Sequence, residues 1–291
     1  MRILHAQHLG MCFGVRDAIA LARAEAEAGP LTILGDLVHN ATVSADLSAR
    51  GVAIARDVTQ VTTARIMITA HGASERTRTS MRRLGLTVLE ATCPLVHVAH
   101  KGIRALVRDG YHPVIVGQRD HVEVRGLTGD LEDFDVVLNE DDVLALRARA
   151  RMGVAAQTTQ PIEKVRRLVG LIRQRFPQSD VRFVDTVCLP TKQRQDAAAD
   201  MARQADVVVV IGGADSNNTR ELVQTCSRHC RRVHHVQTAA DLCREWFANV
   251  TTVGVTAGTS TPDGVIEQVD RRLRELDAEQ SLAAAAEAVA R

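Results

Sequence analysis

Short apolar runs rich in β-branched residues alternate with longer helical stretches along most of this sequence. The run Val207-Val208-Val209-Val210-Ile211 is apolar on both of its alternating faces, which is typical of a strand covered on both sides of a parallel sheet. Strands that alternate with helices predict parallel sheets joined by right-handed crossovers. We therefore expect an α/β fold with mainly parallel sheets.

The same alternation predicts where the elements lie. We expect strands over residues 2–6, 31–35, 65–70, 87–89, 113–117, 135–138, 152–155, 181–184, 206–211, 232–236 and 252–255. We expect helices over residues 15–28, 95–108, 161–175, 193–204, 219–228 and 262–276. The Ala-rich stretch 282–291 is helix-prone by composition.

Composition and charge argue against several classes of function. The chain has 291 residues, of which 45% are hydrophobic and 24% charged, as in an ordinary globular protein. Its formal net charge of +1 argues against broad electrostatic binding to nucleic acid or to an anionic membrane. No apolar run approaches the roughly 18 residues that a membrane span needs, and residues 1–8 lack the apolar core of a signal peptide. We therefore expect a cytoplasmic protein that binds neither nucleic acid nor membrane.

Small polar residues follow six of the expected strands. Ligands of parallel α/β sheets bind at the carboxyl ends of the strands, where these residues are expected to lie. Each segment by itself is also typical of a turn or a helix cap. Together they predict one polar cavity, formed by residues 35–40, 69–72, 117–121, 156–159, 212–218 and 257–260.

Three of the six cysteines stand between an expected strand and an expected helix. They are Cys12, Cys93 and Cys188, spaced by about one third of the chain. A helix N-terminus favours the thiolate form that binds metal, and three thiolates suit an iron–sulfur cluster with one iron left open. Spacing alone also allows three ordinary half-buried cysteines. The equivalent positions indicate three similar α/β units that meet at one point.

The remaining cysteines, Cys226, Cys230 and Cys243, differ in context. Cys226 and Cys230 are four residues apart on an expected helix, and hence on one face. Zinc ligation with nearby histidines is conceivable, but no standard zinc-finger spacing is present. We interpret these three as packing residues, because free cysteines are often buried.

Several short motifs occur in the order found in a known family. They are Gly10-Met11-Cys12-Phe13-Gly14-Val15, Val38-His39-Asn40, Ala70-His71-Gly72, Ala91-Thr92-Cys93-Pro94-Leu95-Val96, Gln157-Thr158-Thr159, Cys188 followed by Arg194-Gln195, and Gly254-Val255-Thr256-Ala257-Gly258. With them the sequence resembles 4-hydroxy-3-methylbut-2-enyl diphosphate reductase, the iron–sulfur oxidoreductase that ends the non-mevalonate pathway of isoprenoid biosynthesis. The resemblance covers nearly the whole chain.

The resemblance implies that Cys12, Cys93 and Cys188 hold a 4Fe-4S cluster with one open iron site. It also implies three α/β units arranged around this cluster. The first spans residues 13–93, the second 94–186, and the third 187–275 together with 1–12. An Ala-rich helical or frayed tail follows over 276–291.

The implied reaction is the reductive dehydroxylation of (E)-4-hydroxy-3-methylbut-2-enyl diphosphate to isopentenyl and dimethylallyl diphosphate. Two electrons pass through the cluster, whose open iron binds the allylic hydroxyl as a Lewis acid. Reduced ferredoxin or flavodoxin is the implied electron donor.

The resemblance also assigns residues to this small diphosphate substrate. Neutral imidazole, hydroxyl and amide groups can hold a diphosphate by many hydrogen bonds. The implied groups are those of His39, His71, His121, Ser216, Asn217, Asn218 and Ser260. Glu123 matches the carboxylate that relays protons, and Thr158 the threonine that works with it. Because Glu123 follows His121 by two residues, both side chains project to the same side if the segment is extended.

The sequence departs from the usual pattern of this family near the implied site. Phe13 replaces a small Ala beside Cys12, and Val122 replaces a Pro whose rigid φ helps to aim the following Glu. Asp215 and Asn217 stand in a segment that is usually Asn-Ser-Ser-Asn, and an inward-pointing Asp215 is unfavourable beside an anionic group. Two alternatives therefore remain: a divergent relative that acts on another small phosphorylated or hydroxylated compound, and a non-enzymatic cluster protein or sensor.

Overall fold

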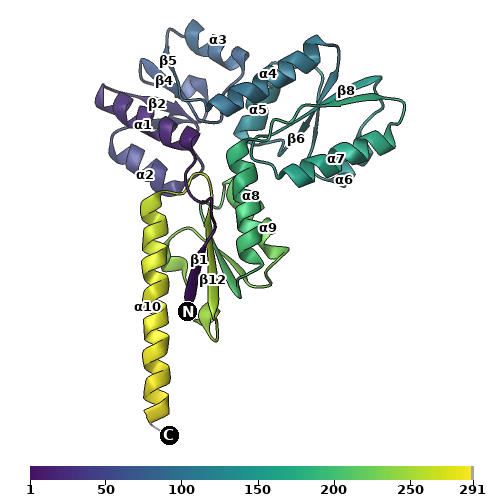
Figure 1. The fold of residues 1–291 in the computed structure, drawn as a ribbon. Helices are drawn as coiled ribbons and strands as arrows, with labels where there is room; N and C mark the ends of the chain where they lie inside the picture. The colour runs from purple at the N-terminus through teal and green to yellow at the C-terminus, as the bar shows by residue number, and fades with distance from the viewer. Residues whose placement is uncertain (290–291) are drawn as a thin grey trace. The chain divides into compact units, whose positions relative to one another are not determined.

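The computed structural model of the chain describes residues 1–289, and the side chains of residues 1–282. These residues form three four-stranded sheets with the strand orders β1-β12-β10-β11, β3-β2-β4-β5 and β7-β6-β8-β9 (Figure 1). Every strand pairing in the three sheets is parallel. The predicted α/β class with mainly parallel sheets is therefore confirmed.

The chain divides into two compact units. Unit 1 comprises Met1–Cys12 and Gln193–Arg291, and unit 2 comprises Phe13–Lys192. The boundary falls inside α8 (Leu189–Ala202). Among residues 1–289, no helix is long and apolar enough to cross a bilayer.

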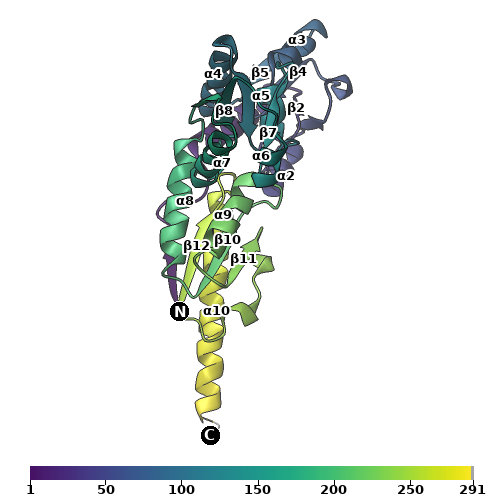
Figure 2. The same cartoon turned by 90° about the vertical axis from the view of Figure 1, so that its right-hand side faces the viewer.

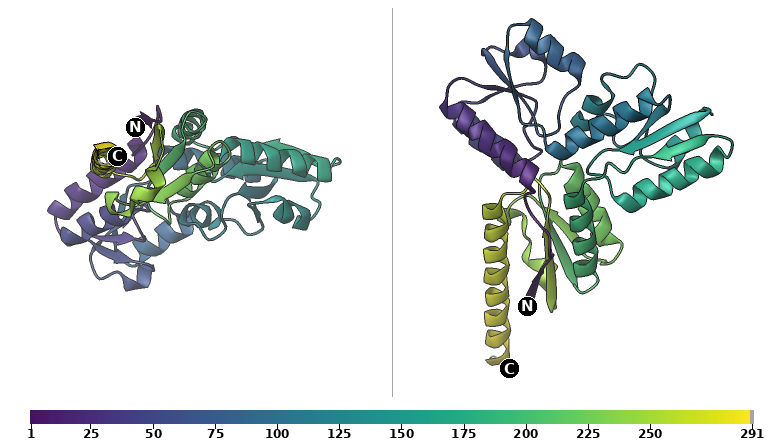
Figure 3. Two further views of the ribbon diagram at one scale, coloured as in Figure 1. Left: turned by 90° about the horizontal axis from the view of Figure 1, so that it is seen from below. Right: turned by 45° about the horizontal axis from the view of Figure 1, so that its top comes forward.

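Unit 1 holds one sheet and its helices. Its elements are β1 (Arg2–His5), β10 (Val207–Ile211), α9 (Asn217–Ser227), β11 (Val233–Val236), β12 (Thr252–Ala257) and α10 (Asp263–Val289), with short 3-10 helices at Ala239–Asp241 and Arg244–Phe247. Helix α9 lies beside β10 and β11 (Figure 2), and the right view of Figure 3 shows α10 running along the same sheet. The predicted helical tail lies in α10 as far as Val289, and residues 290–291 lie outside the described residues.

The apolar run of β10 is buried on both faces, as its sequence predicts. Val208 packs in a cluster with Leu222 of α9, whereas its neighbour Val209 packs in a second cluster with Leu273 of α10. All five residues of β10 are buried. A strand covered by helices on both faces of its sheet exposes no side chain to solvent, which explains why the sequence of β10 contains no polar residue.

Unit 2 holds the other two sheets. The first sheet is built from α1 (Phe13–Glu27), β2 (Thr32–Leu34), α2 (Ala41–Ala49), β3 (Ala53–Ala55), a 3-10 helix at Val58–Gln60, β4 (Arg65–Ile68), α3 (Glu75–Arg83) and β5 (Thr87–Glu90). The second is built from α4 (Pro94–Arg108), β6 (His112–Val116), α5 (Val122–Thr128), β7 (Asp135–Val137), α6 (Glu140–Ala145), β8 (Arg151–Ala156), α7 (Ile162–Arg175) and β9 (Asp180–Phe183). In the second sheet, Ile115 packs against α4 and α5, and Val114 packs against α7 on the other face.

The sequence pattern does not predict the shorter elements of unit 2. These are α2, α3, α5, α6 and β3, which have between 3 and 9 residues each. An amphipathic period needs a window of about 11 residues to stand out, so helices this short carry almost no periodic signal. Their N-caps do carry a signal, because Asn40 and Ser74 accept backbone N–H groups of the first turns of α2 and α3.

Replacement of Ile115 by Ala is expected to lower the free energy of unfolding by about 2–5 kcal/mol, because the side chain is fully buried and its removal leaves a cavity. The matched control is Ile54→Ala on the edge strand β3, where the side chain is 42% exposed. This control is expected to cost less than about 1 kcal/mol. Urea unfolding of both variants measures the difference, and equal losses would contradict this account of the core.

Candidate functional site

The three spaced cysteines each immediately precede a helix. Cys12 comes directly before α1, Cys93 is the N-cap residue of α4, and Cys188 comes directly before α8. None of the three forms a disulfide, and all three residues are partly exposed. The predicted placement between a strand and a helix is therefore confirmed for each of them.

Each cysteine is also anchored in the same way. The cysteines follow the edge strands β1, β5 and β9, and each peptide N–H donates to a carbonyl in the loop after the adjacent strand, β12, β4 or β8. The three bonds are Cys12 N to Thr259 O (3.2 Å), Cys93 N to Ala70 O (3.0 Å) and Cys188 N to Thr158 O (3.0 Å). Three sheets with the same strand order thus present one cysteine each at an equivalent point.

Two local features fix the cysteine loops further. The thiol of Cys93 lies against Gly14, where an added Cβ would come within 2.4 Å of the sulfur. In unit 1, the buried guanidinium of Arg194 donates from Nε (3.0 Å) and Nη2 (2.7 Å) to the carbonyl of Gly10, two residues before Cys12. These contacts restrict the positions that the Cys93 sulfur and the Cys12 loop can adopt.

Three histidines from separate loops of unit 2 meet in one cluster. His39 follows β2, His71 follows β4, and His121 caps α5. Their ring centroids are 4.6 Å apart for His39 and His71, 5.0 Å for His39 and His121, and 5.5 Å for His71 and His121. Each offers a ring nitrogen within 4.8 Å of the other two. The fold therefore brings together three of the residues that the sequence assigned to the substrate.

The hydrogen bond at His121 decides what this cluster can bind. Its Nδ1 accepts the peptide N–H of Glu123 at 3.1 Å, so Nδ1 carries no proton. In the neutral ring the proton then sits on Nε2, which makes the imidazole a donor toward a ligand. A metal at Nε2 would need that nitrogen's lone pair, whereas an anion uses the N–H as it stands. At His121 this geometry therefore favours an anion over a metal ion.

Burial disfavours the protonated form of His71, one member of the cluster. Desolvation holds the pKa of His71 well below its usual value, and the neighbouring His39 and His121 act in the same direction. At neutral pH His71 is therefore uncharged and can bind a ligand only through hydrogen bonds. An anion that brings negative charge into the cluster would reverse part of this shift, because it stabilises the imidazolium.

Glu123 and Thr158 form a buried pair. The carboxylate accepts the peptide N–H of Thr158 at 2.6 Å and its hydroxyl at 3.0 Å, and both side chains are less than 5% exposed. Burial raises the pKa of Glu123 to about 7, although the hydrogen bonds from Thr158 act in the opposite direction. A carboxyl group that titrates near neutral pH can both donate and accept a proton, as general acid–base catalysis requires.

The expectation that His121 and Glu123 lie on an extended segment is wrong. Residues 121–123 are not extended: His121 is the N-cap of α5, and Glu123 lies in the first helical turn. The two residues are linked because the His121 ring accepts the Glu123 backbone N–H, and not because their side chains share one side of a strand. A helix cap replaces the extended geometry, since the imidazole can satisfy a backbone donor that the first turn leaves free.

The predicted polar residues of unit 1 gather around the start of α9. Ser216 caps this helix by accepting the N–H of Thr219 at 3.3 Å, and Asn217, Asn218 and Ser260 are all at least 95% buried. Asn218 accepts the N–H of Thr259 at 3.0 Å, while its amide nitrogen is buried with no hydrogen-bond partner among the described residues. A buried donor without a partner is costly and indicates a ligand group.

One further residue of unit 1 belongs with this set and was missed in the sequence. Thr219 is fully buried, and its hydroxyl has no hydrogen-bond partner within the described chain. An added Cβ at Gly212 or Gly258 would lie 2.4 Å or 2.3 Å from that hydroxyl. The signal in the sequence is the pair of glycines that directly follow β10 and β12, because glycine is needed where a side chain approaches a backbone this closely.

The other three cysteines have different surroundings. Cys226 and Cys230 are buried in the apolar cluster of α8, α9 and β10, which confirms the packing prediction for these two. They do not share a helix face as expected, because α9 ends at Ser227 and Cys230 follows it. Burial, with a smaller contribution from Cys230, raises the pKa of the Cys226 thiol to about 12, which leaves it unreactive. Cys243 is exposed, so the packing prediction is wrong for it: it precedes a surface 3-10 helix and has no apolar layer above it.

Comparison with known proteins identifies the family. Residues 3–274 match the family described as LytB protein. The chain belongs to this family. A relative from Pelobacter propionicus is 36% identical over 95% of this chain and 99% of its own length, and one from Aquifex aeolicus is 35% identical over 94% and 96%. Both are named 4-hydroxy-3-methylbut-2-enyl diphosphate reductase, so the family predicted from the motifs is confirmed.

Solved structures agree with this assignment. A structure of (E)-4-hydroxy-3-methyl-but-2-enyl diphosphate reductase, described as the terminal enzyme of the non-mevalonate pathway, is 35% identical, with a TM-score of 0.67 and coverage of 94% of this chain and 100% of that chain. A reductase structure from Plasmodium falciparum is 24% identical, with a TM-score of 0.86 and coverage of 94% of this chain and 87% of that chain. This second match supports the fold alone.

The structure accounts for several departures from the family pattern. Val122 is the first residue of α5, a position at which Pro is tolerated but not required, and the His121 cap starts the helix without it. The side chain of Asp215 is exposed, so its charge is solvated. Phe13 begins α1 with its side chain 47% exposed. Asn217 replaces a hydroxyl by an amide that can still donate hydrogen bonds.

The raised pKa of Glu123 predicts a pH-dependent stability. Because the folded pKa is about 7 and the usual value is 4.5, folding binds a proton between these pH values, and this contribution to stability is lost as the pH rises toward 8. The stability of the wild type relative to Glu123→Gln is therefore expected to fall by about 3 kcal/mol between pH 4 and pH 8.

Urea unfolding of the cluster-free protein across this pH range measures the difference between the two chains. Glu132→Gln, at an exposed carboxyl of the same unit, is the matched control and should show no such trend. A difference between the wild type and Glu123→Gln that does not change with pH would contradict the buried, protonatable state of this carboxyl.

Proposed function

We propose that this chain catalyses the reductive dehydroxylation of (E)-4-hydroxy-3-methylbut-2-enyl diphosphate to isopentenyl and dimethylallyl diphosphate. One observation carries the proposal. Thr158 donates its N–H and its hydroxyl to the titratable Glu123, and its carbonyl accepts the N–H of Cys188. A single residue thus joins a proton donor to a cysteine that the family resemblance assigns to an iron–sulfur cluster.

The cysteines suit the cofactor that this reaction needs. Cys12, Cys93 and Cys188 form no disulfide, are partly exposed and are placed before helix N-termini, where thiolates are favoured. The contact between the Cys93 sulfur and Gly14 leaves the sulfur in a cradle that any larger residue would fill. We assign these three residues to a 4Fe-4S cluster with one open iron. When bound, such a cluster supplies electrons and a Lewis-acid site for the substrate hydroxyl.

The diphosphate would be held by hydrogen bonds from uncharged groups. His121 offers its Nε2–H, and the neighbouring His39 and His71 complete the cluster in unit 2. In unit 1 the candidate ligands are Ser216, Asn217, Asn218, Thr219 and Ser260. The unpartnered amide of Asn218 and hydroxyl of Thr219 are suited to this role, since a ligand oxygen would satisfy a donor that the fold leaves buried and unpaired.

Glu123 would supply protons to the reaction through Thr158. Cleavage of the C–O bond and formation of a C–H bond and water consume two electrons and two protons. With a pKa of about 7, Glu123 is partly protonated at neutral pH and hydrogen-bonds the Thr158 hydroxyl, which can pass a proton on in a relay. Burial of the pair keeps bulk water from competing for that proton.

The remaining assignments follow from this function. The proposed electron donor is reduced ferredoxin or flavodoxin, and the proposed location is the cytoplasm. We also propose the domain boundaries 13–93, 94–186 and 187–275 with 1–12, because each range contains the strands of one sheet. Since Asp215 is solvated and Val122 starts α5 normally, neither supports a different substrate class. The allylic diphosphate is therefore the substrate we propose.

Anaerobic turnover tests the function directly. The reconstituted wild type with a reduced donor should convert the allylic diphosphate to the two isomeric products. Glu123→Gln is expected to lower kcat by about 10²- to 10⁴-fold at unchanged iron content, because it removes the proton donor and leaves the cysteines intact. Glu132→Gln should retain full activity. A wild-type protein that loads a full cluster but forms neither product would overturn the proposed function.

Gly14→Ala tests the cluster assignment separately from activity. The added methyl group would lie 2.4 Å from the Cys93 sulfur, so the sulfur must move, and the reconstituted variant is expected to hold less iron and sulfide per chain. Gly170→Ala in α7 is the matched control, because it meets open space. Iron and sulfide analysis after anaerobic reconstitution measures both, and equal cluster content in the two variants would count against Cys93 as a ligand.

A further inference from the structure

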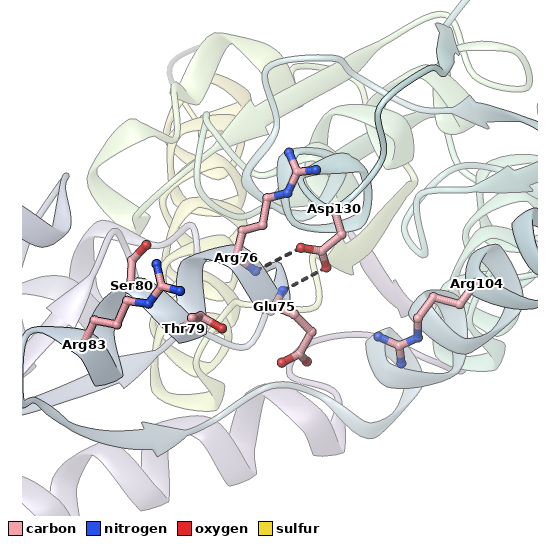
Figure 4. A pocket seen from close by; sticks show the side chains of 7 residues that line it. All are labelled: Glu75, Arg76, Thr79, Ser80, Arg83, Arg104 and Asp130. Atoms are coloured by element: carbon pink, nitrogen blue, oxygen red, sulfur yellow. Dashed lines mark hydrogen bonds between the residues drawn. The ribbon is translucent and has the colours of Figure 1, made fainter.

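A basic cavity of unit 2 lies outside the residues proposed for substrate and cluster. It has a volume of about 530 Å³ and is bordered by α3, by Arg104 of α4 and by Asp130 (Figure 4). Arg76 and Arg83 of α3 are seven residues apart and hence on one face of that helix. This face lines the cavity. Figure 4 shows Arg83 and Arg104 on opposite sides of the cavity.

The two acidic residues of this cavity are engaged, whereas its arginines are not. Both carboxylate oxygens of Asp130 accept backbone N–H groups, from Glu75 at 2.8 Å and from Arg76 at 2.9 Å. Glu75 pairs with Arg78 at 3.2 Å. Within the described residues, the exposed guanidinium groups of Arg76, Arg83 and Arg104 form no ion pair. Their positive charge is therefore available to a partner.

The basic surface continues along α4 toward a predicted cluster ligand. Lys101, Arg104 and Arg108 lie on one face of α4 and are exposed, and the helix contains no acidic residue. Cys93 is the N-cap of the same helix. At a rise of about 1.5 Å per residue, Lys101 lies roughly 12 Å and Arg104 roughly 16 Å along the axis from Cys93. We call these residues, with Arg76 and Arg83, the α3–α4 basic face.

We infer that the α3–α4 basic face is the docking surface for an acidic electron carrier. The inference rests on the proposed function, which needs an external protein to deliver electrons near Cys93. The chain as a whole carries a formal charge of only +1, so this concentration of cations is local and complements an acidic face. Arg108 pairs with Asp109 at 3.5 Å, whereas Arg76, Arg83 and Arg104 form no ion pair among the described residues. The residues that border the cavity include no aromatic side chain on which a nucleic acid base could stack.

Charge reversal at two positions tests this surface. The variant Arg83→Glu with Arg104→Glu changes two exposed side chains that the proposed mechanism does not use. Arg147→Glu, which changes an exposed arginine outside this face, is the matched control. Stopped-flow absorbance then measures cluster reduction without substrate, by reduced ferredoxin and by photoreduced deazariboflavin, a small neutral reductant.

In the double variant, the second-order rate constant for cluster reduction by ferredoxin is expected to fall at least tenfold at low salt. That rate constant is also expected to lose most of its dependence on salt concentration. Its rate with deazariboflavin should equal that of the wild type, because the cluster itself is unchanged. A ferredoxin rate within twofold of the wild type, or an equal loss in Arg147→Glu, overturns the docking surface. Since no substrate is present, this outcome is independent of turnover, whose absence would instead refute the proposed function.

Discussion

Parallel pairing of every strand in the three sheets determines where the loops that carry the candidate site residues lie. Parallel strands direct all of their carboxyl ends to one edge of a sheet, so the loops that follow them are neighbours. Each cysteine follows an edge strand, and its N–H bonds to the loop of the adjacent strand. The same strand order in three sheets therefore repeats one local arrangement, with Thr259, Ala70 and Thr158 as the acceptors.

Burial gives the loops of unit 2 their chemical properties. Inside the fold, the cost of a charge is high, which raises the pKa of Glu123 and lowers that of His71. Near pH 7 His71 is therefore neutral, and Glu123 is partly protonated and accepts hydrogen bonds from Thr158. A net charge of +1 for the whole chain is compatible with diphosphate binding, because a small anion can be held by many neutral donors.

Much of the fold and of the candidate site follows from the sequence. Most of the longer strands and helices lie within a few residues of the predicted ranges, because long apolar periods indicate buried faces. The exception is the helix expected over 262–276, which continues to Val289. The placement of Cys12, Cys93 and Cys188 before helices was also predictable from their flanking runs. The short α5 was not, since no period develops over 7 residues, and this misplaced Glu123 on an extended segment. Thr219 was not predicted as a site residue, because what marks it is the close approach of its hydroxyl to Gly212 and Gly258. These two glycines are far from each other in sequence.

The fold class, the three equivalent cysteines and the set of residues that resemble those of a known family all follow from the order of amino acids. Which atoms of those residues can act depends on how the chain folds around them. The proton on Nε2 of His121 follows from a bond to the Glu123 backbone, and the pKa of Glu123 follows from its burial with Thr158. Tautomers and pKa values depend on the immediate surroundings of each group, which residues distant in sequence supply.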